Sequence, residues 1–402
     1  MSAAEVVARS LRPDLQGQEP YGAPQLDVPV RLNTNENSYA VPQPVVAAIT
    51  AAVADSATGL NRYPDREFTA LRDDLAAYLL EQSAVAVTRE QIWAGNGSNE
   101  VLLHLVQAFG GPGRVALGFT PAYSMHPIIS RTAGTTWVDG HRGSPTGAFN
   151  LDADDVVAQV RQARPHLVFL CSPNNPTGTA LPLAVVQEVL EATRTDYPAI
   201  VVVDEAYAEF ARAGTPSALT LLTAYPNLVV TRTMSKAFAL AGGRVGYLAA
   251  APELVDALRL VRLPYHLSSQ TQAIARAAIA NRAALLAEVE AIKRQRDRIV
   301  DECAALGFPP VASDANFVLF GGLADQARTW QALLDRGVLV RDVGIDHHLR
   351  VTAGTPEETT AFLEAMARLD ESHRQARASV SSPAPAASTD SSRTRPAQGA
   401  PA

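Results

Sequence analysis

The chain has 402 residues, 47% of them hydrophobic, and carries a formal net charge of −7. This length and composition are ordinary for a globular protein of two or three domains with large buried cores. The mildly acidic balance includes no block of like charges, which argues against nucleic acid or an anionic membrane as a partner.

Cysteine usage and the N-terminal residues indicate a cellular compartment. Cys171 and Cys303 are the two cysteines, too few for a disulfide framework or a zinc site and typical of a reducing compartment. The first residues, MSAAEVVARSLRP, have no apolar core of signal-peptide length, and no run approaches the roughly 18 apolar residues of a membrane span. We therefore expect a soluble cytoplasmic protein without a bound metal.

The first part of the chain is predicted to form an arm followed by two helices. Residues 1–43 are rich in Pro, Asn and Gln and contain one strand-like run, 28–32. One helix is predicted from Pro44 and a second from Phe68, where leucines recur at helical spacing. Between them lies a turn in which Tyr63 precedes a proline, so its backbone is extended and its side chain is placed to point outward.

Between about 90 and 265, short apolar strands alternate with helices. The strands read QIWAG, RVALGF, TTWVD, HLVFLC, AIVVVD, NLVVT and VGYLAA. Such alternation favours an α/β fold with a mostly parallel seven-stranded sheet flanked by helices. We assign this large domain to 44–268, a smaller α+β domain to 269–376 and a disordered Ser-, Pro- and Ala-rich tail to 377–402. Unbroken helices are expected over 269–306 and in ETTAFLEAMARLDESHRQAR.

Four loops place polar residues directly after a predicted strand, at the edge where open α/β sheets bind ligands. In GNGSNE, residues 95–100, the glycines allow close approach of a ligand, and Ser98 is predicted to cap a helix whose N-terminus suits a phosphate. A well-capped helix start without a ligand explains the same residues equally well. In TPAYSMHP, Tyr123 is either a core aromatic or a ring that stacks on a planar ligand.

The other two loops are SPNNPTG, residues 172–178, and DEAY, residues 204–207. Asn175 either belongs to a structural turn or hydrogen-bonds a ligand oxygen. Asp204 ends an apolar strand, where a buried carboxylate needs a cationic partner such as a protonated ring nitrogen, unless it caps the next helix. Tyr207 is close enough in sequence to contact the same ring.

The run TRTMSKAFALAGGRVGY, residues 231–247, contains Lys236 just after a predicted strand and Arg244 between glycines. Most loop lysines are simply exposed, and Lys236 alone gives no reason to expect otherwise. The four preceding loops favour a catalytic amine, because they supply a partner for a cationic ring, a stacking face and a phosphate site.

The sequence motifs typical of nucleotide-binding proteins, metalloenzymes and serine hydrolases are either absent or in the wrong context. GGPGRVA, from Gly110, precedes a strand instead of following one, which is the wrong context for a dinucleotide loop. The sequence has no Walker A, HExxH or GxSxG pattern, and the adjacent His347 and His348 are more typical of a solvent-facing loop. NAD, ATP, metal and serine-hydrolase functions are therefore disfavoured.

Taken in order, RYPD, GNGSNE, SPNNPTG, DEAY, SKAFALAGGRVGY, ANFVLF and LRVTAGT resemble the motifs of the fold-type I pyridoxal 5'-phosphate (PLP) aminotransferases, over about residues 20–370. Within that family the pattern is similar to the histidinol-phosphate aminotransferases. The resemblance implies the PLP-dependent transferase fold of type I, PLP as cofactor, and an obligate homodimer with shared active sites. One departure is Asn99, where many relatives carry Asp. Since a backbone N–H can serve the phosphate with either side chain, little functional consequence is expected.

For the cofactor, the resemblance implies covalent attachment to Lys236 and pairing of Asp204 with the ring nitrogen. Tyr207 and Asn175 would hydrogen-bond the phenolic oxygen of the ring, and Tyr123 would stack on it. The other implied residues hold the phosphate: Ser98, Asn99, Ser235 and Arg244, with Tyr63 of the partner subunit.

For the substrate, the resemblance implies that Arg341 and Arg350 meet its anionic group, with Asn175 beside it, and that Tyr21 of the arm helps to close the site. Lys236 would be the general base. The implied reaction converts L-histidinol phosphate and 2-oxoglutarate to 3-(imidazol-4-yl)-2-oxopropyl phosphate and L-glutamate. An aromatic amino acid aminotransferase on the same scaffold is the nearest alternative. A threonine-phosphate decarboxylase and a non-catalytic regulator of the same fold are more distant ones.

Overall fold

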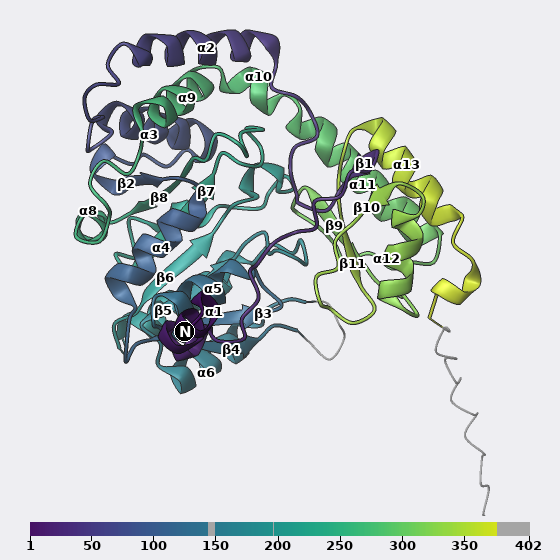
Figure 1. The fold of residues 1–402 in the computed structure, drawn as a ribbon. Helices are drawn as coiled ribbons and strands as arrows, with labels where there is room; N and C mark the ends of the chain where they lie inside the picture. The colour runs from purple at the N-terminus through teal and green to yellow at the C-terminus, as the bar shows by residue number, and fades with distance from the viewer. Residues whose placement is uncertain (144–148, 196, 376–402) are drawn as a thin grey trace, which may run out of the picture.

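The computed structural model describes residues 1–143, 149–195 and 197–375, so the tail predicted over 377–402 lies outside the described residues. Figure 1 shows a larger unit built around one sheet and a smaller unit at the C-terminal side of it. The N-terminal segment crosses from the larger unit to the smaller one (Figure 1).

Within the described residues, the sheet of the larger unit has seven strands in the order β2-β8-β7-β6-β5-β3-β4. They are β2 (Ile92–Gly95), β3 (Val115–Thr120), β4 (Thr136–His141), β5 (Leu167–Cys171), β6 (Ile200–Asp204), β7 (Leu228–Thr233) and β8 (Gly246–Ala250). From β4 to β7 all neighbours are parallel, while β8 lies antiparallel between β7 and β2. The predicted mostly parallel seven-stranded sheet and all seven of its strands are confirmed.

Helices pack around this sheet, which explains why its strands are apolar on both faces. They are α2 (Gln43–Ala57), α3 (Thr69–Ser83), α4 (Ser98–Phe109), α5 (Met125–Thr132), α6 (Ala153–Ala163), α7 (Leu183–Thr195), α8 (Pro252–Leu258) and α9 (Ser269–Ala280). α4 packs on β2, β7 and β8, α6 on β3, β4 and α7, and α9 on α2 and α3. The arm contains a further helix, α1 (Ala3–Ser10), which its composition did not predict. No described helix combines the length and apolar character that crossing a bilayer requires.

The smaller unit is formed by the C-terminal part of the chain together with a strand of the arm. Its elements are α10 (Arg282–Leu286), α11 (Val289–Ala305), β9 (Phe317–Phe320), α12 (Gln326–Leu334), β10 (Val338–Leu339), β11 (Leu349–Thr352) and α13 (Pro356–Ala367). β9 and β11 are antiparallel, and β1 (Val30–Arg31) of the arm pairs in parallel with β10. The strand-like run predicted at 28–32 therefore fastens the arm to the smaller unit.

Two helices that the sequence predicted as unbroken are shorter than expected. The segment 269–306 is divided into α9, α10 and α11. The first break lies at Asn281, whose side chain donates to the Ala277 carbonyl and whose backbone leaves the helical conformation. The last helix ends at Ala367, and Asp370 caps a separate short turn over 371–373. Both predictions were wrong where a polar side chain binds the backbone.

The ends of several strands meet at one edge of the sheet. β5, β6 and β7 end side by side there, with Cys171 opposite Asp204 and Asp204 opposite Thr231. β2 ends at the same edge. Its last residue, Gly95, pairs with Gly246 of β8, which in turn pairs with Thr233 at the end of β7. The polar loops singled out in the sequence follow these strand ends.

Candidate active site

A cavity of about 630 Å³ opens at this edge of the sheet. It is lined by all but one of the side chains predicted to bind cofactor or substrate: Tyr21, Ser98, Asn99, Tyr123, Asn175, Asp204, Tyr207, Ser235, Lys236, Arg244, Arg341 and Arg350. The exception is Tyr63. The fold therefore gathers residues from the arm, the larger unit and the smaller unit into one place.

Tyr63 lies outside the cavity, on the molecular surface. Its side chain is 80% exposed, and its ring stacks on that of Tyr265 with the centroids 4.4 Å apart. This orientation matches the one expected from the turn before Pro64.

Lys236 follows β7, and its Nζ donates a hydrogen bond to the Thr34 carbonyl oxygen at 3.2 Å. Removal from water, helped by Arg350 and Arg244 and opposed by Glu36, lowers the pKa of Lys236 to about 8. A neutral amine is therefore accessible close to neutral pH, which nucleophilic and base chemistry at a lysine requires.

Asp204 ends β6 and is buried at the wall of the cavity. Its Oδ1 accepts from the Thr231 hydroxyl at 3.1 Å, and its Oδ2 lies 3.1 Å from Nε2 of His126. His126 was not among the predicted site residues; it lies in the first turn of α5, and its ring meets the Tyr123 ring edge to face with the centroids 5.4 Å apart. Thr231 and His126 hold the Asp204 carboxylate in one orientation.

Tyr207 and Asn175 converge in the cavity. Nδ2 of Asn175 lies 3.4 Å from the Tyr207 hydroxyl oxygen, and a second amide, that of Asn35, donates to the same oxygen at 3.0 Å. Burial raises the pKa of Tyr207, so its hydroxyl keeps its proton and can donate. Asn35 is a second site residue that was not predicted, because it lies in the arm and follows no strand of the large sheet.

The helix start predicted to hold a phosphate differs in one detail from the expectation. Gly97, with φ 86°, is the N-cap of α4, and Ser98 is its first residue, so the prediction of Ser98 as the cap was wrong. A positive φ favours glycine, and an added Cβ at Gly97 would lie 2.5 Å from Nη2 of Arg244. Nη1 of Arg244 lies 3.5 Å from the Ser235 hydroxyl. A helix N-terminus, a guanidinium and two hydroxyls thus line one part of the cavity, which suits a phosphate.

Asn99 contacts the ring predicted to stack on the cofactor. Its Oδ1 accepts from the Tyr123 hydroxyl at 3.2 Å. An aspartate at this position would accept the same bond, so the departure at Asn99 leaves the contact available.

Arg350, on β11, brings a buried guanidinium to the cavity. Its Nη1 donates to Oδ1 of Asn175 at 2.6 Å and its Nη2 to the Asn33 carbonyl at 2.8 Å. Its Nε is buried and has no hydrogen-bond partner among the described residues. Burial, with a contribution from Arg341, lowers the pKa of Arg350 to about 10. A buried cation with neutral acceptors and an unpaired donor favours the binding of an anion.

Arg341 lies beside Arg350, because the two residues exchange backbone hydrogen bonds of 2.9 Å. Nη2 of Arg341 donates to the Gly22 carbonyl at 3.3 Å. Tyr21, also in the arm, lines the cavity with its side chain 53% exposed. The two arginines and the tyrosine predicted for the substrate are therefore neighbours.

Comparisons with known sequences identify close relatives. A family model described as aminotransferase class I and II matches residues 28–366. A histidinol-phosphate aminotransferase from Paenarthrobacter aurescens (strain TC1) is 62% identical over 359 residues, which cover 89% of this chain and 94% of the relative. Another of that name, from Frankia casuarinae, is 61% identical over 358 residues, 89% of each chain.

Comparison with solved structures also finds aminotransferases. The histidinol-phosphate aminotransferase of Sinorhizobium meliloti, in complex with pyridoxal-5'-phosphate, has a TM-score of 0.74 at 26% identity and covers 85% of this chain and 90% of its own. An aspartate aminotransferase of Thermus thermophilus with maleate has a TM-score of 0.72 at 27% identity, with 84% and 91% covered. This chain therefore belongs to the aminotransferase class I and II family.

Proposed function

We propose that this chain is a PLP-dependent histidinol-phosphate aminotransferase of L-histidine biosynthesis. It transfers the amino group of L-histidinol phosphate to 2-oxoglutarate, giving 3-(imidazol-4-yl)-2-oxopropyl phosphate and L-glutamate. The relatives that carry this name are 61% and 62% identical to it. The structural observation that carries the proposal is Arg350, whose buried Nε lacks a partner among the described residues and which shares a cavity with the Lys236 amine.

The cavity fits PLP. The buried Asp204 carboxylate suits a protonated ring nitrogen, and the helix start at Ser98, with Arg244, suits a phosphate. Lys236 lines the same cavity with an amine of lowered pKa. When bound, PLP supplies a ring that accepts the electrons released as the Cα of the amino donor loses its proton.

The roles of the side chains follow from their contacts. Asp204, oriented by Thr231 and His126, would pair with the ring nitrogen and stabilise a proton on it. Nζ of Lys236 would take the proton from the Cα of the amino donor and would deliver a proton to the former aldehyde carbon of the cofactor, so that the donor leaves as a ketone. Tyr207 and Asn175 would bind the phenolic oxygen, Tyr123 would cover the ring, and the phosphate would be held by Ser98, Asn99, Ser235 and Arg244.

The same cavity receives two different anions in turn. Arg350 and Arg341 bind the phosphate of L-histidinol phosphate in one half-reaction and a carboxylate of 2-oxoglutarate in the other. A guanidinium offers a fork of N–H donors that suits both groups. Tyr21, at the same cavity, helps to close it around the substrate.

A panel of amino donors tests this function. With purified protein, PLP and 2-oxoglutarate, we expect kcat/KM for L-histidinol phosphate to exceed that for L-phenylalanine by at least roughly a hundredfold, because the site is built around polar recognition. A higher value for phenylalanine would establish the aromatic alternative instead. Lys236→Ala is expected to abolish turnover while its circular dichroism stays that of wild type, and persistent turnover would overturn the assignment of Lys236.

We further propose that two chains form a homodimer with shared active sites, in which Tyr63 of the partner subunit reaches the phosphate-binding residues. Exposed apolar side chains support this proposal, because they gather on two neighbouring segments, 60–67 and 259–266. They are Leu60 (52% exposed), Tyr63 (80%), Leu260 (86%), Leu263 (76%) and Tyr265 (38%). Apolar side chains exposed in such a group mark an interaction surface.

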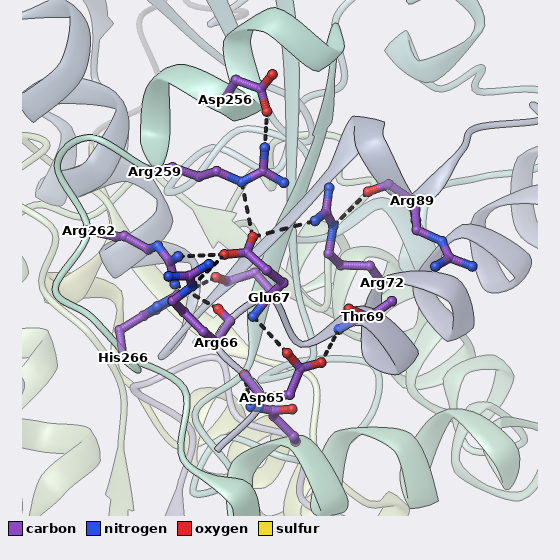
Figure 2. Close-up of polar contacts among 12 residues, drawn as sticks. Asp65, Arg66, Glu67, Thr69, Arg72, Arg89, Asp256, Arg259, Arg262 and His266 are labelled. Atoms are coloured by element: carbon purple, nitrogen blue, oxygen red, sulfur yellow. Dashed lines mark hydrogen bonds and ion pairs between the residues drawn. The ribbon is translucent and has the colours of Figure 1, made fainter. Parts of the chain in front are cut away.

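Glu67 holds these two segments together (Figure 2). Its Oε2 lies 3.0 Å from Nε of Arg259, and its Oε1 lies 2.7 Å from Nη2 of Arg262. Nη1 of Arg262 also donates to the Arg66 carbonyl at 2.7 Å. Tyr63 is therefore displayed from a braced segment, which lowers the ordering cost of its insertion into a second copy of the chain.

The remaining proposals concern location and domains. We propose that the enzyme acts in the cytoplasm, where its Cys171 and Cys303 stay reduced.

We also propose that the chain is divided into an arm (1–43), a large domain (44–268), a small domain (269–376) and a tail (377–402). The antiparallel pair β9–β11 and the helices α11 and α13 packed on each other support a separate small domain.

A further inference from the structure

Three consecutive residues of the arm, Asn33–Asn35, run along the cavity and are called the strap below. The Asn33 carbonyl accepts from Nη2 of Arg350 at 2.8 Å. The next carbonyl, that of Thr34, accepts from Nζ of Lys236 at 3.2 Å. The anion-binding guanidinium and the reacting amine are therefore held by adjacent peptide groups.

Asn35, the third residue of the strap, holds Tyr207. Its Nδ2 donates to the Tyr207 hydroxyl oxygen at 3.0 Å. Its other three polar groups are also used: the backbone N–H donates to Oγ1 of Thr352 at 3.0 Å, Oδ1 accepts from the same Oγ1 at 3.2 Å, and the carbonyl accepts from Nδ2 of Asn316 at 3.2 Å. The residue is 1% exposed. An asparagine with every polar group paired in the interior fixes the local backbone.

The backbone of Asn35 also restricts what can replace it. Its φ is 54°, in the left-handed region that Asn, Asp and Gly adopt more readily than other residues. The strap turns at this point, so the amide that reaches Tyr207 and the carbonyl that reaches Lys236 both depend on one conformation.

The strap is anchored in the smaller unit, whereas two of the groups it contacts, Lys236 and Tyr207, lie in the larger one. Just before it, the Leu32 N–H donates to the Leu339 carbonyl at 2.8 Å, and the Leu32 carbonyl accepts from the Thr352 N–H at 2.9 Å. Lys236 follows β7 of the large sheet. A shift of β11, which carries Arg350 and Thr352, is therefore passed through the strap to the amine.

We propose that the strap sets the Lys236 amine relative to Arg350 and Tyr207, and that Asn35 is the positioning residue that fixes it. This inference rests on the proposed transaminase function. Asn35 acts through the groups it holds and not on the substrate itself. Asn35 thereby links Arg350, which binds the substrate anion, to Nζ of Lys236, which moves the proton.

The amine can be examined without substrate or cofactor. Lys236 and Lys293 are the only two lysines of the chain, so acetylation by an N-hydroxysuccinimide ester, followed by peptide mass spectrometry, reports Lys236 against Lys293 as an internal reference. In the cofactor-free protein, Asn35→Gly keeps a residue that accepts the left-handed φ but removes the side chain. We expect the acetylation rate of Lys236 relative to Lys293 to rise severalfold, because the Thr34 carbonyl no longer holds the amine.

Kinetics of the PLP-loaded enzyme supply the second readout. Asn35→Gly is expected to lower kcat for L-histidinol phosphate about tenfold, the scale set by one hydrogen bond to a charged or reacting group, while KM changes by less than about threefold. Asn227→Ala is the matched control, since it removes an amide with two hydrogen bonds of 3.1 Å, to Thr193 and Ala199, beside the opposite edge of the sheet. It is expected to lower stability and leave Lys236 acetylation and kcat unchanged.

A second pair of variants guards against misfolding of Asn35→Gly. Thr352→Val removes only the hydroxyl that anchors Asn35, and it should increase Lys236 acetylation in the same direction but less, while Thr352→Ser restores the wild-type rate. Unchanged acetylation in both Asn35→Gly and Thr352→Val, or an equal increase in Asn227→Ala, would overturn the strap proposal. Absence of L-histidinol phosphate turnover in the wild type would instead refute the proposed function. The acetylation rates of the cofactor-free proteins would still test the strap proposal, because they do not depend on turnover.

Discussion

The chemistry of the candidate site depends on the charges around one amine. Burial, Arg350 and Arg244 lower the pKa of Lys236 from its ordinary 10.5 to about 8. An ammonium is disfavoured there, so less free energy is needed to free the lone pair that takes a proton. The same shift makes the folded cofactor-free protein sensitive to pH.

Between pH 8 and 10.5, the unfolded chain holds a proton at Lys236 that the folded chain has already lost. Stability of the cofactor-free protein should therefore rise with pH across this window, by at most about 1.4 kcal/mol per pH unit from this one group. Lys236→Met should remove that contribution. Urea unfolding of both proteins from pH 8 to 10.5 measures the difference in slope, and identical slopes would contradict the lowered pKa.

Arg350 is expected to serve both substrates. Arg350→Ala should raise KM for L-histidinol phosphate and for L-glutamate by about 10- to 100-fold, because each anion loses a hydrogen-bonded cation worth roughly 1.5–3 kcal/mol. Arg341→Ala should have a smaller effect, since its guanidinium is less buried. Steady-state kinetics with each substrate varied in turn checks both, and an unchanged KM for L-glutamate would rule out the shared role.

Single residues were predictable from sequence where a local rule applies to them. Asp204 ends a buried strand and Asn175 lies in the loop after another, and a buried polar residue at either place needs a ligand or a hydrogen-bond partner. His126 and Asn35 carry no such signal. Asn35 meets Thr352 across 317 positions of sequence, and no local pattern reports a contact of that range.

At the scale of elements, β8 passes very close to the start of α4. An added Cβ at Gly246 would collide with backbone atoms of Gly97 and Ser98, which cannot rotate away. Gly246→Ala should therefore destabilise the protein by about 1–3 kcal/mol and weaken PLP binding, as the helix start is pushed from its place. Gly59→Ala is the control, because its Cβ would meet only the Ser56 carbonyl, at 3.7 Å. Denaturant unfolding and PLP titration measure both effects, and a Gly246→Ala protein with wild-type PLP affinity would refute the close-approach argument.

Elements were predictable to the extent that their residues repeat a simple pattern. The seven strands of the large sheet are apolar on both faces because helices cover both, so continuous apolar runs identified them. Helix ends depend instead on single side chains, and Asn281 ended α9 inside a run without a strong breaker. α1 was missed although Ser2 and Glu5 form a capping box, a signal present in the sequence but overlooked in a polar arm.

At the scale of the whole molecule, the cavity is assembled from units with different tasks. Lys236 and Asp204 come from the larger unit, Arg341 and Arg350 from the smaller one, and the arm passes between them (Figure 1). In the proposed function, the large sheet would hold the cofactor while the smaller unit would bind the substrate anion. Sequence motifs indicated both sets of residues, but the path of the arm between them emerges only from long-range contacts.

Tyr63 does not line the cavity that contains Lys236 and Asp204, so its proposed role requires a second copy of the chain. In a twofold dimer, the site that keeps Lys236 of one chain uses Tyr63 of the partner subunit. Lys236→Ala and Tyr63→Ala homodimers should both be strongly impaired. Unfolded together and refolded in equal amounts, they should regain about a quarter of the wild-type sites, because half of the dimers are mixed and each mixed dimer has one intact site. Activity no greater than the mean of the two pure proteins would refute the shared site.

The double variant Leu260→Asp, Leu263→Asp tests the proposed dimer surface. Sedimentation should show a monomer, since two charges would be buried in the apolar surface that the partner is proposed to cover.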